Sequence, residues 1–288
     1  MSTDKRPLDI LIVTYNSEKF IRHLIADLSK SKVVNKVLIY DNNSGDRTRQ
    51  IIKKHKTNKV VTYFGKQNIG FGKAMNILVR NSKTEYQILI NPDIKLKNNA
   101  IEKILKCAVR QKSDITGGAM VGEDGSIQRS FTRIPTSMTI LFEFTNLKKI
   151  FPNNYWHKKF LYKDIGYPKQ SLEVGSVSGG YMLIKKSSFE LLGGFDENFF
   201  MYLEDVDICK RAHQSNMKVT YCPNSRVFHS GGGSSKNKHR INYEAWDEAR
   251  MWYIKKNHKT PILLSQILAL AIKGDILITR MRREKHVD

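Results

Sequence analysis

The chain of 288 residues has few cysteines and no long apolar run. Cys107, Cys209 and Cys222 are an odd number of cysteines without metal-type spacing, which predicts buried free thiols in a reducing compartment rather than a disulfide scaffold. The apolar run over 8–13 is too short for a secretory signal. That over 262–272 falls well short of the roughly 20 residues that span a bilayer. We therefore expect a cytoplasmic protein that is not integral to a membrane.

Acidic residues are also scarce, 27 against 49 lysines and arginines, which gives a formal net charge of +22. Such a charge attracts nucleic acid, an anionic membrane face or phosphorylated substrates. The densest basic cluster directly follows the apolar 262–278 stretch and consists of Arg280, Arg282, Arg283, Lys285 and His286. Two interpretations stay open: an interfacial membrane anchor, or a packed terminal helix with a solvated basic tail.

Several signatures of other phosphate-handling proteins are missing. Residues 68–76 (NIGFGKAMN) match neither a dinucleotide-binding fingerprint nor a P-loop. No helix-turn-helix, RNA-binding sheet or basic stripe with stacked aromatics is evident, which argues against a nucleic-acid-binding protein. A nucleotidyltransferase would typically show a Gly-rich N-terminal loop with a basic residue, and residues 13–20 (VTYNSEKF) form no such loop.

Strand-like and helix-like patterns alternate over the first hundred residues. We expect strands at 8–14, 37–40, 60–63 and 86–90, and helices at 18–30, 46–55 and 70–82. This alternation predicts an α/β fold of βαβ units around a mostly parallel sheet.

The pattern becomes mixed after residue 113. We expect strands within 116–121, 173–185, 219–222 and 226–229, helices near 187–192, in the second half of 193–214 and from 243 onward, and an irregular aromatic segment over 129–170. Residues 1–240 then form one catalytic unit, with a donor half at about 8–110 and an acceptor half at about 111–240, and residues 241–288 form a C-terminal helical extension.

Polar residues follow the expected strands where each strand ends, and ligands of parallel sheets bind beyond these carboxyl ends. They are Thr14, Tyr15 and Asn16, then Asp41, Asn42 and Asn43, then Asn68, and finally Asn91 and Asp93. The sequence therefore predicts one ligand crevice at this edge.

Three short motifs suit sugar transfer, although each also has an ordinary structural explanation. Asp93 in INPD (90–93) could hold a divalent cation against a diphosphate, or belong to a simple turn. Asp205 in YLEDVD (202–207) could act as a general base, or be an acidic residue favoured at a helix start. His229, before three glycines, could serve a metal or phosphate, or lie in a surface turn. The basic residues that follow, Lys236, Lys238, His239 and Arg240, could close over a diphosphate.

The order of the motifs is more specific than any one of them. They are VTYN (13–16), YDNNSGD (40–46), QNIGFGKAMN (67–76), INPD (90–93), SGGYMLIKK (178–186), GGFDENFFMYLEDVDICKR (193–211) and FHSGGGS (228–234). Over roughly residues 8–258 the chain resembles family-2 glycosyltransferases of the rhamnosyltransferase-like branch. The resemblance implies a GT-A, Rossmann-like nucleotide-binding fold and an inverting, metal-dependent hexosyltransferase.

The resemblance also implies residue roles. Asp205 matches the catalytic base, with Glu204 and Asp207 in supporting positions, while Asp93 and His229 match the metal site for Mg²⁺ or Mn²⁺. The nucleotide-sugar would contact Thr14, Tyr15, Asn16, Asp41, Asn43, Asn68, Gly70, Phe71, Asn76 and Asn91, with Asp41 hydrogen-bonding the base. The acceptor side would include Gly179, Gly180 and Tyr181.

One position departs from the wider family. Asn91 stands where the first acid of the DxD-type motif is expected, so fewer charged ligands remain for the metal. The branch implies dTDP-L-rhamnose as donor and a polyprenol-diphosphate-linked saccharide as acceptor, in bacterial cell-surface polysaccharide synthesis. A UDP-sugar donor is the alternative. An enzyme with such an acceptor would be peripheral at the inner face of the cell membrane, bound to anionic lipid. The oligomeric state, a dimer included, is left open.

Overall fold

The computed structural model describes residues 6–55, 57–97, 99–230, 239–257 and 262–284. The N-terminal elements are β1 (Leu8–Thr14), α1 (Ile21–Lys30), β2 (Val34–Asp41), α2 (Thr48–Lys54), β3 (Val60–Phe64), α3 (Phe71–Asn81), β4 (Tyr86–Ile90), β5 (Ile94–Leu96) and α4 (Ala100–Gln111). The middle of the chain forms β6 (Ile115–Val121), β7 (Ile127–Gln128), β8 (Phe131–Thr132), α5 (Ser137–Glu143), α6 (Leu147–Ile150) and α7 (Tyr155–Phe160). The remaining elements are β9 (Leu172–Glu173), β10 (Ser176–Val177), β11 (Tyr181–Lys185), α8 (Lys186–Leu191), α9 (Glu204–Gln214), β12 (Val219–His229), α10 (His239–Asn257) and α11 (Ile262–Glu284).

One large sheet organises the molecule, with the strand order β3-β2-β1-β4-β11-β6-β12-β5. β3, β2, β1 and β4 are parallel, and β6 and β12 run in the same direction, whereas β11 and β5 are antiparallel to their neighbours. All residues of β1 and β4 are buried, as expected for central strands that are covered on both faces. The predicted α/β class with a mostly parallel sheet is confirmed.

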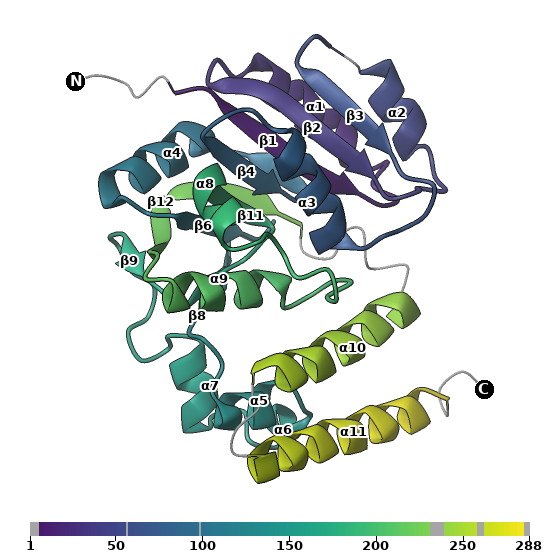
Figure 1. The fold of residues 1–288 in the computed structure, drawn as a ribbon, viewed down its shortest axis with the longest axis vertical. Helices are drawn as coiled ribbons and strands as arrows, with labels where there is room; N and C mark the ends of the chain where they lie inside the picture. Colours follow the sequence, from purple (N-terminus) through teal and green to yellow (C-terminus); the bar gives the residue numbers. More distant parts are fainter. Residues whose placement is uncertain (1–5, 56, 98, 231–238, 258–261, 285–288) are drawn as a thin grey trace.

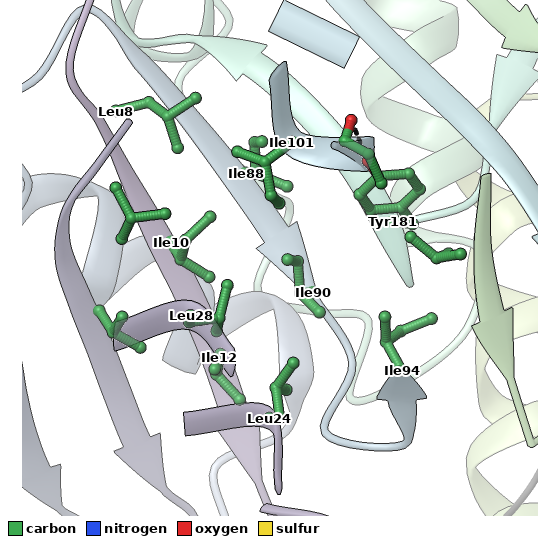
Figure 2. Packing of buried hydrophobic residues seen from close by; sticks show 14 of the residues in the cluster. Leu8, Ile10, Ile12, Leu24, Leu28, Ile88, Ile90, Ile94, Ile101 and Tyr181 are labelled. Atoms are coloured by element: carbon green, nitrogen blue, oxygen red, sulfur yellow. Dashed lines mark hydrogen bonds between the residues drawn. The ribbon is translucent and has the colours of Figure 1, made fainter. Parts of the chain in front are cut away.

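Two apolar layers cover the two faces of the sheet. On one face α1 and α4 pack against alternate strand residues, among them Ile10 and Ile88 (Figure 2). On the other face α3, α8 and α9 pack against the residues in between, such as Leu11 and Leu89. Because successive strand residues point to opposite faces, these two sets of side chains stay separate. The sheet therefore divides the domain into an α1/α4 face and an α3/α9 face.

The C-terminal helices form the base of the molecule together with α5–α7 (Figure 1). Their contact is a third apolar cluster, which includes Phe144, Tyr253, Leu268 and Ile272. Arg250 on α10 joins it through ion pairs of 2.6 Å to Asp247 and 2.7 Å to Asp275. The predicted C-terminal helical region is confirmed as two helices. Within the described ranges, none of the helices combines the length and apolar character needed to cross a bilayer.

Several elements differ from the sequence expectation. α4 is not among the expected helices, although its buried residues have helical spacing: Ala100, Ile101, Ile104 and Ala108. The segment expected to be irregular over 129–170 contains β8 and the short helices α5–α7. The two strands expected at 219–222 and 226–229 are a single strand, β12, whose register shifts between Cys222 and Arg226.

Candidate active site

Hydrogen bonds to the carboxylate of Asp41 connect the end of β1 to the loop after β2. Oδ1 accepts from the Ser44 amide at 3.0 Å and from Arg49 Nε at 2.5 Å, and Oδ2 accepts from Thr14 Oγ1 at 3.1 Å and Ser44 Oγ at 2.5 Å. Asp41 and Thr14 are fully buried. They end β1 and β2, and therefore lie beneath the place where the sequence predicts the ligand crevice. A contact of Asp41 with a base would require one of these donors to move, and it stays a prediction.

Tyr15, Asn16 and Asn43 lie at the surface of these loops. Asn16 and Asn43 adopt left-handed backbone conformations, with φ of 50° and 63°, which asparagine tolerates better than most residues. The Asn16 side chain accepts from the Gly45 amide at 2.7 Å, and so holds the two loops together. Tyr15 is half-buried and Asn43 is exposed. The predicted contacts of all three with the donor remain open to experiment.

Asn42, which directly follows β2, binds the segment before α3 through two hydrogen bonds. Asn42 Nδ2 donates to the Gly70 carbonyl at 3.0 Å, and Asn42 Oδ1 accepts from the Ile69 amide at 3.1 Å. Asn68 Oδ1 in turn accepts from the Gly70 amide at 3.0 Å. These bonds fix the backbone at residues 68–70 beside the strand ends, where the sequence analysis places the donor.

Gly70 brings this segment against the connection between α8 and α9, which leads into the acidic motif. Its φ is +85°, and a Cβ there would lie 2.4 Å from the Phe200 carbonyl oxygen. The next amide, that of Phe71, donates to the same carbonyl at 2.8 Å. Only glycine combines this backbone conformation with so close an approach. The residues around 70 and 200, far apart in sequence, are therefore neighbours.

Asp205 lies directly after this contact, at the start of α9. Its Oδ2 accepts from the Gly179 amide at 2.9 Å, and its Oδ1 accepts from the Val206 amide at 2.8 Å. A Cβ on Gly179 would lie 3.5 Å from both Asp205 Cβ and Phe71 Cε1, so Gly179, Phe71 and Asp205 line one small space. Burial raises the pKa of Asp205. A carboxylate with a raised pKa is a better proton acceptor, which suits a general base.

Tyr202 and Leu203, just before the acidic pair, both have positive φ, 76° and 65°. Such conformations cost free energy in residues other than glycine, and they are concentrated at functional sites. Glu204 points into the interior beside Gly72. Burial and the neighbouring Asp205 raise the pKa of Glu204 to about 8. At neutral pH Glu204 therefore favours its protonated, uncharged form.

Asp207 has a structural role. It is fully buried and accepts from Arg211 Nε at 2.8 Å, while Lys256 Nζ on α10 lies 2.8 Å from its Oδ1. Lys256 also pairs with Asp196 at 2.8 Å. Asp207 thus connects α9 to α10. Its predicted supporting role in catalysis stays a prediction.

Asp93 and His229 come together although 136 positions separate them in the sequence: His229 Nε2 is 3.5 Å from Asp93 Oδ1. β5 and β12 produce this proximity, since they pair through His229 and Ile94. Gln128 Nε2 donates to the His229 carbonyl at 2.9 Å, so its Oε1 faces His229 Nδ1, at 2.7 Å. An amide oxygen can only accept, and Nδ1 therefore carries a proton.

In the neutral ring, Nε2 then presents a lone pair toward the Asp93 carboxylate. Two acceptors that face each other repel unless a cation or a proton lies between them. A neutral histidine whose other nitrogen is held by a hydrogen bond is the usual form of a metal ligand. The pair therefore fits a divalent cation with oxygen and nitrogen ligands. No group of three or more potential metal-binding side chains occurs in the described ranges. Phosphate oxygens and water are common further ligands of Mg²⁺ in such sites.

The turn before β11 connects the two acidic centres. The Asn91 amide donates to the Gly180 carbonyl at 2.9 Å, and a Cβ on Gly180 would lie 2.9 Å from Asn91 Nδ2. Gly180 is thus packed against the residue two positions before Asp93, and Gly179 binds Asp205. A continuous run of contacts joins Asp205 to Asp93 and His229.

Two predicted ligand residues are corrected by the structure. Tyr181 is fully buried on the α1/α4 face, where its hydroxyl donates to the Ala100 carbonyl at 3.0 Å, so it offers no surface to an acceptor (Figure 2). Asn76 is also buried, and its amide bonds the backbone of Phe195 and the Glu197 carboxylate. It positions the loop before Asp205 and has no atom available for the nucleotide-sugar.

Two residues at the site carry no sequence signal. Gln128 lies in the two-residue strand β7, and its role depends on the pairing of β7 with β6. Arg49, on α2, reaches back to Asp41 and the Gly65 carbonyl. A glutamine and an arginine outside any motif could not be singled out before the pairing was known. The predicted basic closure over 236–240 involves side chains outside the described part of the chain.

Comparison with known proteins agrees with this geometry. The family model described as glycosyl transferase family 2 matches residues 9–193, and one described as N-terminal domain of galactosyltransferase matches residues 161–231. An N-acetylglucosaminyl-diphospho-decaprenol L-rhamnosyltransferase of Mycobacterium tuberculosis is 25% identical over 96% of each chain. A dTDP-rhamnosyl transferase of Shigella flexneri is 27% identical over 88% of this chain and 82% of that protein.

Solved structures show the same fold. The mannosyltransferase PcManGT of Pyrobaculum calidifontis, in complex with GDP-Man and Mn²⁺, matches with a TM-score of 0.58 and 13% identity, over 94% of this chain and 71% of that one. The expected GT-A fold is therefore confirmed. With the family model covering more than half of its residues, the chain belongs to glycosyltransferase family 2.

Proposed function

We propose that this glycosyltransferase transfers L-rhamnose from dTDP-L-rhamnose, with inversion, to a polyprenol-diphosphate-linked saccharide in cell-surface polysaccharide synthesis. The observation that carries the proposal is the run of contacts from Asp205 through Gly179, Gly180 and Asn91 to Asp93. These contacts support a proton acceptor and a cation acting at one sheet edge, as sugar transfer from a diphosphate requires. The relatives named above, which act with rhamnose donors and a decaprenol-linked acceptor, support the choice of substrates.

In this mechanism Asp205 takes the proton of the acceptor hydroxyl as its oxygen attacks the anomeric carbon. The Gly179 amide orients the carboxylate, since it donates to Oδ2. Attack from the face opposite the diphosphate inverts the anomeric centre in one displacement and needs no covalent intermediate. Asp93 and His229 would hold Mg²⁺ or Mn²⁺, which would neutralise the charge of the departing diphosphate.

The acceptor side differs from the sequence expectation because Tyr181 does not reach it. Of the two glycines, Gly180 is packed against Asn91, whereas Gly179 lies beside Asp205. A side chain at Gly179 would meet Asp205 and Phe71. We infer that the absence of a side chain at Gly179 keeps space beside Asp205 for a sugar hydroxyl.

A donor screen tests the enzyme class. dTDP-rhamnose, UDP-galactose, UDP-glucose and UDP-N-acetylglucosamine are each incubated with Mg²⁺ or Mn²⁺, with wild-type enzyme and with Asp205→Asn. Turnover of dTDP-rhamnose that needs the cation and is nearly lost in the variant supports the proposal. Preference for a UDP-sugar would favour the alternative donor. Absence of binding by all four would contradict a nucleotide-sugar enzyme.

The acceptor implies a position at the membrane, and α11 has a face suited to it. Leu268 and Ile272 are buried, whereas Leu270 and Leu277 are 67% and 61% exposed on the opposite side of the helix. Ile267, Ile278 and Met281 share this exposed side. A helix with a second, uncovered apolar face in a strongly basic protein suits the interface of an anionic bilayer. We propose that this face rests on the membrane.

Point variants test this proposal better than deletion of α11, because deletion would remove Leu268 and Ile272 and uncover the apolar residues that they cover, such as Phe144 and Tyr253. Leu270→Gln with Leu277→Gln should reduce flotation with phosphatidylglycerol vesicles. Leu191→Gln, at a residue 77% exposed on α8, is the matched control. If the double variant floats as well as wild type, α11 does not form the contact.

A further inference from the structure

A second cavity lies away from the catalytic residues. Its volume is about 570 Å³, within the range of small-molecule sites. It opens between α4 and the part of β12 whose register shifts between Cys222 and Arg226. Since α4 packs on the α1/α4 face and Asp205 begins α9 on the other face, the sheet separates this cavity from the catalytic base. It is therefore a site distinct from the crevice.

The cavity is lined by positive charge. Its cationic residues are Lys97, Lys103, Lys106, Arg110 and Arg226, and no carboxylate lines it. Lys103, Lys106 and Arg110 recur at helical spacing, so they share one side of α4. Arg226 comes from β12, and Lys97 follows β5 with its ammonium group 4.7 Å from the Phe228 ring centroid. Three separate elements thus direct cations to one space.

These cations differ from those that pair with carboxylates in the interior of the molecule. Arg211, Arg250 and Lys256 each pair with a buried carboxylate at 2.6–2.8 Å. Among the residues that the structure describes, none of the five cations at the cavity forms a salt bridge. All five are exposed, so water compensates them in place of a carboxylate. An anionic ligand would replace that water and relieve their mutual repulsion.

The floor of the cavity offers uncharged polar groups. Ser171 Oγ is 3.3 Å from Cys107 Sγ, and Cys222 and Asn224 complete the lining. A hydrogen bond with Cys222, assisted by Ser171 and by the charge of Arg110, lowers the pKa of Cys107 to about 7. The charge of Arg110 thus reaches the buried part of the lining. Hydroxyl and amide donors beside lysines and arginines are typical of phosphate recognition.

We propose that this cavity, here called the α4 cavity, binds a phosphate-bearing ligand. The five cations supply the attraction, and the size of the cavity allows a diphosphate or a headgroup rather than a single phosphate only. The ligand could be soluble or lipid-borne, and both present the same phosphate oxygens. This site is independent of the sugar-transfer proposal, because none of its lining residues belongs to the run from Asp205 to His229.

The test uses the full chain and two double variants that change the net charge equally. Lys106→Glu with Arg110→Glu reverses two cations of the α4 cavity. Lys30→Glu with Lys54→Glu reverses two exposed lysines of α1 and α2 that do not line the cavity. Pyrophosphate binding is measured by calorimetry in EDTA, which removes cation-dependent binding at the active site. Flotation with phosphatidic acid vesicles is measured in parallel.

We expect the α4 cavity variant to lose about tenfold or more in pyrophosphate affinity, in vesicle binding, or in both, while the control stays within about twofold of wild type. Loss with pyrophosphate assigns a soluble ligand, and loss confined to vesicles assigns a lipid headgroup. Equal binding by the two variants, or no binding by wild type in either assay, overturns the proposal. Donor turnover should be unchanged in the α4 cavity variant, so failure here leaves the sugar-transfer proposal untouched.

Discussion

Replacing Glu204 with glutamine should make the enzyme more stable at alkaline pH. Glu204 is 6% exposed, and its Oε2 has no hydrogen-bond partner within the described structure. Burial first, and then the neighbouring Asp205 carboxylate, raise its pKa from 4.5 to about 8. Glutamine has nearly the shape of a protonated glutamic acid and carries no charge at any pH. The variant therefore keeps the neutral state that the folded protein favours.

The sign and size follow from proton linkage. A carboxyl group whose pKa rises on folding binds its proton more tightly in the folded state, so its destabilising effect is absent below about pH 4.5. The free energy of unfolding then falls as the pH rises, and it levels off above the folded pKa of about 8. The difference between the two pKa values corresponds to about 5 kcal/mol at most. Because Glu204 and Asp205 share their titration, we expect about 2–5 kcal/mol.

Urea unfolding, followed by tryptophan fluorescence at about pH 5, 7 and 9, measures the effect. Wild type should lose stability across this range, whereas Glu204→Gln should lose much less, and the two proteins should be similar at the acidic end. Asp205→Asn is an informative control. It removes the neighbouring charge and so lowers the pKa of Glu204, and the fall in stability should therefore be complete at a lower pH than in wild type. Parallel pH profiles of wild type and Glu204→Gln would refute the reasoning.

Three further substitutions test other parts of the structure. Gly70→Ala should lower the free energy of unfolding by about 2–4 kcal/mol, measured by thermal or urea unfolding. The added Cβ would meet the Phe200 carbonyl, and alanine would have to adopt a positive φ. A cost below about 0.5 kcal/mol would contradict this packing. Gln128→Leu should weaken Mn²⁺ binding about 10–100-fold in a calorimetric titration, because His229 loses the acceptor that fixes its ring, and unchanged affinity would argue against His229 as a ligand. Tyr181→Phe should cost about 1 kcal/mol of stability through the lost hydroxyl bonds and leave donor turnover at the wild-type level; a large loss of turnover would restore Tyr181 to the acceptor side.

The sheet could be predicted from sequence because its strands are local patterns. The expected strands at 8–14 and 86–90 have the same bounds as β1 and β4. Local patterns also placed Asp93 and Asp205 beside helix or strand ends. Helix α4 is not among the expected helices, although its apolar residues have clear helical spacing. The helices within 129–170 are short and rich in aromatic residues, so each contains too few residues to show a helical period.

The errors at the site have a different cause. Tyr181 follows two glycines in a motif, but strand alternation turns its side chain to the α1/α4 face. Asn76 is in the donor-site motif, yet its partner is the loop at 195–197, more than a hundred residues away. Gln128 meets His229 only because β7 pairs with β6. Which side chains meet across such distances is decided by strand pairing, and no local pattern records it.

The bridge through Lys256 has a practical consequence for handling the protein. Lys256 pairs with Asp196 and Asp207, on either side of the acidic pair Glu204 and Asp205, so α10 supports the start of α9 from outside the sheet. Shortening the chain before residue 256 would leave Asp207 buried with only Arg211 as a cationic partner. A purification tag is therefore better placed ahead of β1, and a shortened enzyme that has lost turnover would say little about membrane attachment.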